Sequence, residues 1–237
     1  ILIIISLVFL GCKSKTSSNF SVNNLFSNHM VLQQDAMVNI WGKAKEGSEI
    51  IVSTSWGEKT STFADKDGNW ITPVQTPGFD NKSHKVVIRS SKKSIEIKDV
   101  VLGEVWLASG QSNMEMPMKG FKYARVHELI EGADQEISNA TFPKIRMFTV
   151  ERVIAYSPVD NLQGKWVVCT PKSVNDFSAV AYFFGKKIHQ ELNIPVGLIH
   201  SSWGGSPAES WVRNDFIEKI KGFENTSERL QIAMDPN

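Results

Sequence analysis

The fold class follows from the stretch SAVAYFFGKKIHQEL at residues 178–192 and the run VGLIHS at residues 196–201. In the first stretch, apolar residues recur at helical spacing, at positions 180, 183, 184, 188 and 192. Asp176 or Ser178 can cap the start of this helix, and Asn193 follows its end. The second run is short and continuously apolar, as in a strand buried on both faces of a parallel sheet. A helix followed directly by such a strand predicts an α/β unit.

Two more apolar runs extend this sheet, EVWLAS at residues 104–109 and IRMFTV at residues 145–150. Upstream of them, short strand patterns recur about every ten residues, with turn residues between them. The candidate strands are residues 38–41, 49–54, 59–63, 70–74, 85–89 and 94–98. We therefore expect an α/β chain, with a β-sandwich domain over residues 22–101 and the first part of a parallel α/β domain over residues 102–237.

Composition excludes several classes of protein. The chain has 237 residues, 41% of them hydrophobic, and its 26 basic and 25 acidic residues give a net charge of +1. A disordered chain would be more charged and less apolar, and no basic block suggests nucleic-acid binding. Two cysteines, Cys12 and Cys169, form neither a disulfide framework nor a zinc site unaided. The run DKDGN at residues 65–69 lacks the further ligands of a calcium loop and predicts a hairpin turn. We expect no metal and no cofactor.

The first residues, ILIIISLVFLGC at 1–12, are typical of a signal peptide. Ten apolar residues are too few to cross a bilayer core of roughly 30 Å, which takes about 20 residues in a helix. The sequence FLGC resembles a bacterial lipobox, in which Cys12 would be lipidated. The alternative is an ordinary signal peptide with an incidental cysteine. Either case predicts an exported protein, in the periplasm or as an outer-membrane lipoprotein of a bacterium, with residues 1–21 as signal or anchor and tether.

Two polar motifs follow predicted strands. The first is LASGQSNM at residues 107–114 and the second is IHSSWGGSPAESW at residues 199–211. Ligands of open α/β sheets bind beyond the carboxyl ends of the strands. A serine held there exposes its Oγ near free backbone N–H groups, and two glycines let the backbone approach a substrate. The alternatives are a polar turn in the first motif and a glycine turn before a helix in the second. Because G-x-S-x-G is absent from the sequence, an α/β-hydrolase layout is disfavoured.

These motifs carry a resemblance to a known family. GEVWLASGQSNMEM at residues 103–116 resembles the nucleophile block of the sialate O-acetylesterase family, within the SGNH hydrolase superfamily. PVGLIHSSWGGSPAESW at residues 195–211 is similar to that family's glycine block. LFSNHMVLQQ at residues 25–34, with IWG at residues 40–42, resembles its N-terminal sandwich. The resemblance covers nearly all of residues 22–215.

The resemblance implies roles for the matching residues. Ser112 resembles the nucleophile, and its own N–H would be one oxyanion donor. Gly205, with Gly204 as the alternative, resembles the second donor. Candidate substrate-binding residues are Gln111, Asn113, Trp203 and Glu209. Trp203 and Trp211 could stack on sugar rings, whereas Trp106, on a predicted buried strand, is expected in the core.

The general base of this superfamily is a histidine in a terminal Asp-x-x-His block, and a later Asn or Gln supplies a third oxyanion donor. None of the five histidines, at positions 29, 84, 127, 189 and 200, has an aspartate three residues before it. His200 lies near the glycine block but inside a predicted buried strand, which favours a structural role. We expect the missing blocks beyond Asn237, and therefore expect these 237 residues alone to lack esterase activity, because a serine hydroxyl without a base is a poor nucleophile.

The implied activity is that of a serine esterase that removes O-acetyl groups from sugars, first among them sialic acids. The alternatives are an acetyl xylan-type carbohydrate esterase and a catalytically inactive glycan-binding surface protein. The expected partner is an acetylated glycan, with no nucleic acid, and with a membrane contacted only through a lipid on Cys12.

Overall fold

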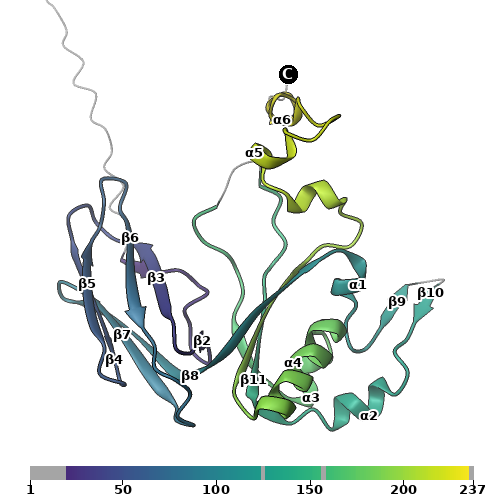
Figure 1. Cartoon of the computed structure of the whole chain (residues 1–237), viewed down its shortest axis with the longest axis horizontal. Coiled ribbons are helices and arrows are strands. Elements are labelled where there is room, and N and C mark those ends of the chain that lie inside the picture. Colours follow the sequence, from purple (N-terminus) through teal and green to yellow (C-terminus); the bar gives the residue numbers. More distant parts are fainter. Residues whose placement is uncertain (1–19, 124–125, 156–158, 235–237) are drawn as a thin grey trace, which may run out of the picture.

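The structure is a computed structural model that describes residues 20–123, 126–155 and 159–234. The predicted signal segment and Cys12 lie outside the described residues. Two β-rich layers on one side of the molecule adjoin a sheet with helices on the other side (Figure 1). The mixed α/β class expected from the sequence is confirmed.

The first half of the chain is a pair of sheets. One sheet has the order β1-β3-β6, formed by Ser21–Val22, Met37–Lys43 and Asn69–Gln75. The other contains β4 (Glu49–Thr54), β5 (Lys59–Phe63) and β7 (His84–Ser90), in the order β7-β4-β5. Buried residues alternate along β6 and β7, as one-sided burial requires. All six predicted strand patterns lie within observed strands.

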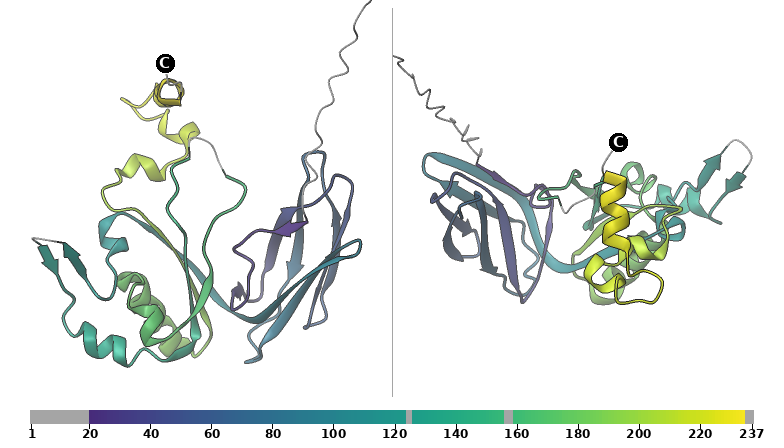
Figure 2. Two further views of the ribbon diagram at one scale, coloured as in Figure 1. Left: turned by 180° about the vertical axis from the view of Figure 1, so that it is seen from behind. Right: turned by 90° about the horizontal axis from the view of Figure 1, so that it is seen from above.

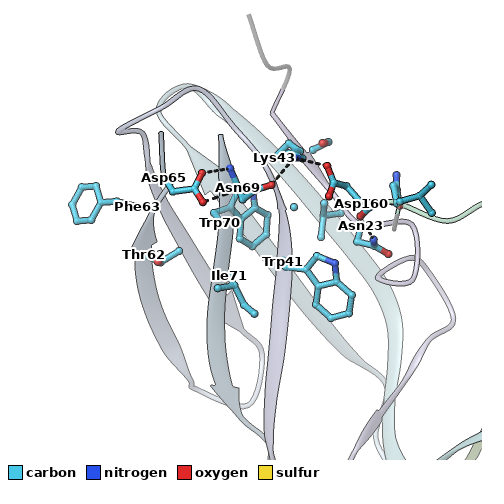
Figure 3. A pocket seen from close by; sticks show the side chains of 15 residues that line it. Asn23, Trp41, Lys43, Thr62, Phe63, Asp65, Asn69, Trp70, Ile71 and Asp160 are labelled. Atoms are coloured by element: carbon cyan, nitrogen blue, oxygen red, sulfur yellow. Dashed lines mark hydrogen bonds and ion pairs between the residues drawn. The ribbon is translucent and has the colours of Figure 1, made fainter. Parts of the chain in front are cut away.

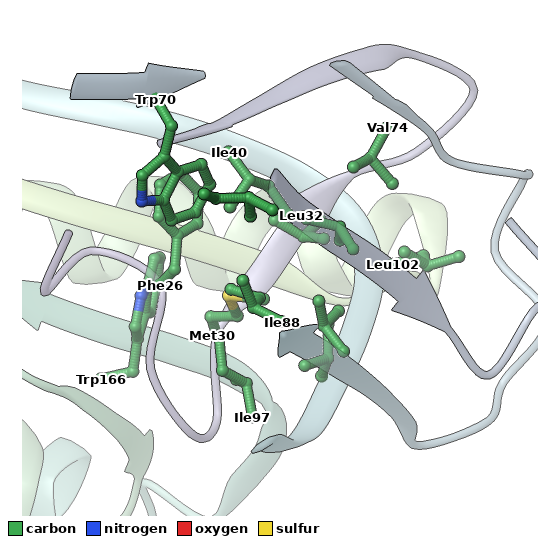
Figure 4. Close-up of a cluster of buried hydrophobic side chains, with 14 of the residues drawn as sticks. Phe26, Met30, Leu32, Ile40, Trp70, Val74, Ile88, Ile97, Leu102 and Trp166 are labelled. Carbon is green, nitrogen blue, oxygen red and sulfur yellow. The ribbon is translucent and has the colours of Figure 1, made fainter. Parts of the chain in front are cut away.

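A single core fills the space between these sheets and extends toward the second half of the chain (Figure 4). Ile40 and Trp70 meet Ile88 in this core, and all three are buried. Trp166, from β12 (Trp166–Cys169), belongs to the same cluster and donates a hydrogen bond from Nε1 to the Leu25 carbonyl, 2.7 Å away. The two halves of the chain are therefore packed against each other.

One long strand, β8 (Lys93–Gly110), joins the two halves. Its first part pairs antiparallel with β7, and its last part pairs parallel with β13 (Val196–Ser202), from Glu104 to Gly110. The strand is seen passing from one half to the other in two views (Figures 1 and 2). The boundary expected between residues 101 and 102 falls inside this strand, so the division into two domains stays a prediction.

The second half carries the sheet order β12-β11-β13-β8, with β11 at Phe142–Thr149. β11, β13 and β8 are parallel, as expected, whereas β12 is an antiparallel edge strand. Helix α4 (Ala179–Leu192) packs on β13 and β11. The shorter elements are β2 (Val31–Gln33), α1 (Ser112–Glu115), β9 (Phe121–Tyr123), β10 (Val126–Glu128), α2 (Ala133–Ser138), α3 (Pro171–Val174), η1 (Ala208–Trp211), α5 (Asn214–Ile217) and α6 (Thr226–Met234). In the described ranges, no helix is long and apolar enough to cross a membrane.

Helix α4 begins and ends as predicted but presents a different face to the sheet. Ser178 caps its start by accepting a hydrogen bond from the Ala181 N–H at 3.2 Å, and Asn193 follows its end in the left-handed conformation. The buried residues are three small ones, Ala179, Ala181 and Gly185, together with Tyr182. A Cβ at Gly185 would lie 2.6 Å from Leu198 Cδ1, so the close approach of helix and sheet requires glycine there.

Most of the large apolar residues of α4 remain exposed, contrary to the pattern-based expectation. Val180, Phe183, Phe184 and Leu192 are exposed, and only Ile188 packs against the core from its partly buried position. Trp106 was also expected in the core and is 43% exposed, with its ring 5.0 Å from that of Phe184. The helix was predicted correctly from its apolar spacing. The small residues of α4, and not the large apolar ones, determine which face packs against the sheet.

Candidate active site

The two polar motifs predicted from the sequence lie side by side. β8 and β13 are parallel neighbours, and their last registered pair is Gly110 with Ser202. The Trp203 N–H donates to the Gly110 carbonyl at 2.9 Å, which continues the contact beyond the strands. A Cβ at Gly204 would lie 3.6 Å from Ser112 Cα, so the glycine loop approaches the backbone of Ser112. Both motifs therefore occupy one edge of the sheet, where α/β proteins bind ligands.

Ser112 opens a one-turn helix directly after β8. Gly110 has φ 143°, a backbone conformation that favours glycine and turns the chain out of the strand. The carbonyl of Gln111 accepts hydrogen bonds from the N–H groups of Met114 and Glu115, each at 3.0 Å. Ser112 is half-buried, and its Oγ donates to Gln111 Oε1 at 2.9 Å. No described residue accepts a hydrogen bond from the Ser112 N–H, which stays available as an oxyanion donor.

The two glycines of the loop differ in the hydrogen bonding of their N–H groups. The loop closes as a turn in which the Ser206 N–H donates to the Trp203 carbonyl at 3.2 Å. The Gly204 N–H donates to the Glu115 carboxylate and is thus engaged. Gly205 has φ 78°, and within the described residues its N–H has no acceptor and a Cβ there would have no neighbour within 4 Å. Of the two predicted donors, Gly205 is the one with a free N–H.

The predicted substrate-binding residues are only partly gathered at this edge. Gln111 contacts Ser112 directly, and Asn113 is exposed in the same turn. Trp203 precedes the two glycines, and its ring lies 6.0 Å from the Arg152 guanidinium. Glu209 is half-buried on η1, and no described interaction joins its side chain to Ser112. A cavity of about 390 Å³ adjoins the loop and is lined in part by Arg152, Ser202, Trp203 and Trp211, but not by Ser112.

His200 is buried in β13, in agreement with its structural interpretation. Its Nε2 lies 2.6 Å from Ser202 Oγ, and its ring packs 5.5 Å from that of Phe177. Burial lowers the pKa of the His200 imidazole, and the nearby charge of Arg152 acts in the same direction. The imidazole is enclosed, and its buried Nδ1 has no hydrogen-bond partner among the described residues. Among the histidines whose side chains the structure describes, at positions 29, 84, 189 and 200, none is hydrogen-bonded to Ser112 Oγ.

Two residues of this edge were missed by the sequence reasoning. Glu115 contacts the glycine loop through Gly204, and Arg152 pairs with Glu115, with 2.6 Å between Nη2 and Oε1. Glu115 carried a usable signal, since it lies three residues after Ser112 and so one helical turn away. Arg152 carried no such signal in the sequence, because only the folded chain brings it to this edge.

The described residues include no group of three or more His, Cys, Asp or Glu side chains that could hold a metal ion.

A second cavity, of about 500 Å³, lies where the sheets of the first half meet residues 159–161 (Figure 3). Its polar side chains satisfy one another, because Lys43 pairs with Asp160 at 2.7 Å and Asp65 accepts from the Asn69 N–H at 2.8 Å. The latter bond lies in the DKDGN run, which is a turn as predicted. The turn joins β5 to β6, however, and these strands belong to different sheets and form no hairpin. None of the predicted site residues lines this cavity.

Several known proteins are similar to this chain over most of its length. No protein-family model matches the chain. Human sialate O-acetylesterase is 30% identical over 211 residues, 81% of this chain and 38% of that protein. The rat protein of the same name is 28% identical over 225 residues, 87% of this chain and 40% of that protein. The chain thus spans about two fifths of the length of these relatives.

A solved structure extends the similarity to the fold. A carbohydrate acetylesterase from Xanthomonas citri matches with a TM-score of 0.74 and 28% identity, over 85% of this chain and 44% of that one. The similarity in sequence and the similarity in fold therefore point to the same kind of protein. The chain belongs to the sialate O-acetylesterase family.

Proposed function

We propose that the full-length protein containing this chain is a serine esterase that removes O-acetyl groups from sugars, with sialic acids as the first candidate substrate. The observation that carries the proposal is the meeting of Ser112 and the glycine loop at the carboxyl ends of two parallel strands. The family membership of the chain supports the same reaction.

In the proposed reaction, Ser112 Oγ attacks the acetyl carbonyl carbon and forms a tetrahedral intermediate. The N–H groups of Ser112 and Gly205 stabilise its negatively charged oxygen. The ester bond then breaks, the sugar oxygen leaves with a proton, and an acetyl-enzyme remains on Ser112. Water releases acetate and restores the serine. None of the histidines at positions 29, 84, 189 and 200 is hydrogen-bonded to Ser112 Oγ. We propose that the general base is a histidine of a later Asp-x-x-His block, as the resemblance to SGNH hydrolases implies.

The test is an assay of the full-length protein on O-acetylated sialic acid and on acetylated xylan, side by side. Release of acetate from the sialic acid, dependent on Ser112, supports the proposal. Release from xylan alone supports the carbohydrate esterase alternative, which the acetylesterase neighbour favours. Glycan binding without acetate release would support the inactive glycan-binding alternative.

We further propose that the protein is exported and that Cys12 carries a lipid. The apolar run before Cys12 and the FLGC sequence support this. Labelling of the wild-type protein, but not of Cys12→Ser, with a fatty acid in a bacterial host is the expected result. Equal labelling of both would contradict lipidation at this residue.

A further inference from the structure

Glu115 connects the nucleophile turn to the glycine loop. It lies on α1, one helical turn after Ser112, and its side chain is only 15% exposed. One carboxylate oxygen, Oε2, accepts the hydrogen bond from the Gly204 N–H, and the other, Oε1, lies 2.6 Å from Arg152 Nη2. Hydrogen bonds to an ionised carboxylate are about twice as strong as neutral ones. The turn that holds Ser112 is therefore tied to the loop that holds the second donor.

Arg152 extends this connection to the end of β13. Its Nε donates to the Ser202 carbonyl at 3.3 Å, and its guanidinium lies over the Trp203 ring. Both contacts are with residues immediately before Gly204. The Glu115 carboxylate is thus held between a backbone N–H of the loop and a cation bound to the same loop.

The hydrogen bond to Gly204 bears on the next residue, Gly205. Side-chain contacts cannot fix Gly205, because it has no side chain and a Cβ there would find open space. Its orientation depends instead on the backbone around it, since each peptide unit is planar and turns as a whole. With the Gly204 N–H bound to Glu115 and the Ser206 N–H bound to Trp203, Gly205 is restrained from both sides.

We propose that Glu115 is a positioning residue of the esterase, which engages the Gly204 N–H and so aims the Gly205 N–H at the oxyanion. Glu115 touches no substrate in this role and donates no proton. The inference rests on the proposed function, because an oxyanion donor matters only if Ser112 performs acyl transfer. Preorganised donors act most strongly in the transition state, so loss of the restraint lowers kcat rather than raising KM.

The experiment compares Glu115→Ala with Glu115→Gln in the full-length protein, with an aryl acetate as substrate. Glu115→Ala removes the acceptor, and we expect kcat to fall by roughly 10- to 100-fold, approaching the loss of an oxyanion donor, with KM little changed. Glu115→Gln keeps an oxygen that can accept from Gly204, and we expect it to restore most of kcat. If Glu115→Ala does not fold, Glu115→Met fills the same space without a comparable acceptor, and the same loss of kcat is expected.

Glu136→Ala is the matched control. Glu136 is also a largely buried carboxylate, with 22% of its side chain exposed, and it is bound by Lys186 and by Tyr182 Oη at 2.6 Å. It lies on α2, away from both motifs. Its removal should lower stability without changing kcat of the folded enzyme.

The possible outcomes separate the two proposals. A folded Glu115→Ala or Glu115→Met protein with wild-type kcat would overturn the positioning role while Ser112-dependent activity stood. Equal losses in the Gln and Ala variants would also overturn it, because the acceptor oxygen would then not be what matters. Absence of Ser112-dependent turnover from the wild-type protein would overturn the proposed function and, with it, this role for Glu115.

Discussion

The molecule contains two serine clusters of opposite character. In the first half, Ser55 Oγ lies 3.1 Å from His84 Nδ1, and His84 Nε2 lies 2.9 Å from Asp80 Oδ1. The three residues are connected in the order of a catalytic triad but with the two imidazole nitrogens exchanged, since a triad serine contacts Nε2 and its aspartate contacts Nδ1. In the second half, the Oγ of Ser112 donates to the Gln111 side chain and is not hydrogen-bonded to any of the histidines at positions 29, 84, 189 and 200. Ser112 nevertheless lies beside a glycine loop.

The surroundings show why the triad-like cluster is structural. Ser55 Oγ accepts the Lys85 N–H at 3.0 Å, and the Ser55 N–H donates to the Lys85 carbonyl at 3.0 Å. His84 is buried, with its ring 5.3 Å from that of Trp56. The cluster therefore ties the turn after β4 to the start of β7. A serine esterase needs oxyanion donors and room for a substrate in addition to a base. Within the described residues, the N–H groups of Ser112 and Gly205 have no acceptor, so they are available for this role.

Replacing each of the two serines by alanine should have opposite effects on activity. Ser112→Ala should abolish turnover of an aryl acetate by the full-length protein, with thermal stability nearly unchanged because the side chain is half-buried. Ser55→Ala is the control and should keep wild-type kcat. Initial rates and melting temperatures check both variants. An inactive Ser55→Ala protein together with an active Ser112→Ala protein would contradict the assignment of the nucleophile.

A substitution in the glycine loop should lower activity less than loss of Ser112 does. Gly205→Val should lower kcat on the order of 10²-fold, because the oxyanion donor would be displaced. Gly47→Val provides a matched control, since Gly47 has φ 71° and is also in open space, but lies in the first half. Steady-state kinetics on both folded variants decide the matter, and equal kcat values would show that the donor lies elsewhere.

The cluster around Ser55 should affect stability instead of activity. His84→Ala removes a buried ring and both of its hydrogen bonds, so we expect a loss of about 1–3 kcal/mol in the free energy of unfolding. The kcat of the folded protein should not change. Denaturant unfolding and an ester assay together test this, and a folded variant without activity would reopen a catalytic role for His84.

The smallest effect concerns the junction of the two regions. Burial raises the pKa of Asp99, but hydrogen bonds from Arg146 and His29 outweigh it and lower the pKa from 3.8 to about 2. A carboxylate with a lowered pKa stabilises the fold above its unfolded pKa. This contribution should therefore be complete above pH 3.8 and be lost as the pH falls toward 2. The free energy of unfolding should fall less steeply with falling pH in Asp99→Asn than in the wild-type protein. Equal slopes of this free energy against pH in the two proteins would contradict the expected contribution of Asp99.

The sequence was most informative where one local pattern dominates. Residues 49–54 and 59–63 were predicted to the residue as strands, and α4 was predicted to within one residue of its start. The position of Ser112 and the glycines at strand ends followed from the buried runs before them. These features depend on neighbours in the chain, which the sequence displays directly.

The remaining features depend on contacts between distant residues. The small residues around Gly185 let α4 approach Leu198, which turned the large apolar residues outward. The continuity of β8 through the expected boundary depends on its pairing with β7 on one side and β13 on the other. The ion pair between Glu115 and Arg152 joins residues that no spacing rule relates.

The role of Ser112 as the nucleophile is tested by locating the acetyl group during turnover. The full-length protein is mixed with an aryl acetate, quenched rapidly in acid and digested, and its peptides are analysed by mass spectrometry. We expect a single acetyl group on Ser112 that is absent from the Ser112→Ala variant. An acetyl group on Ser55, on Ser202 or on another residue, with Ser112 unmodified, would contradict it.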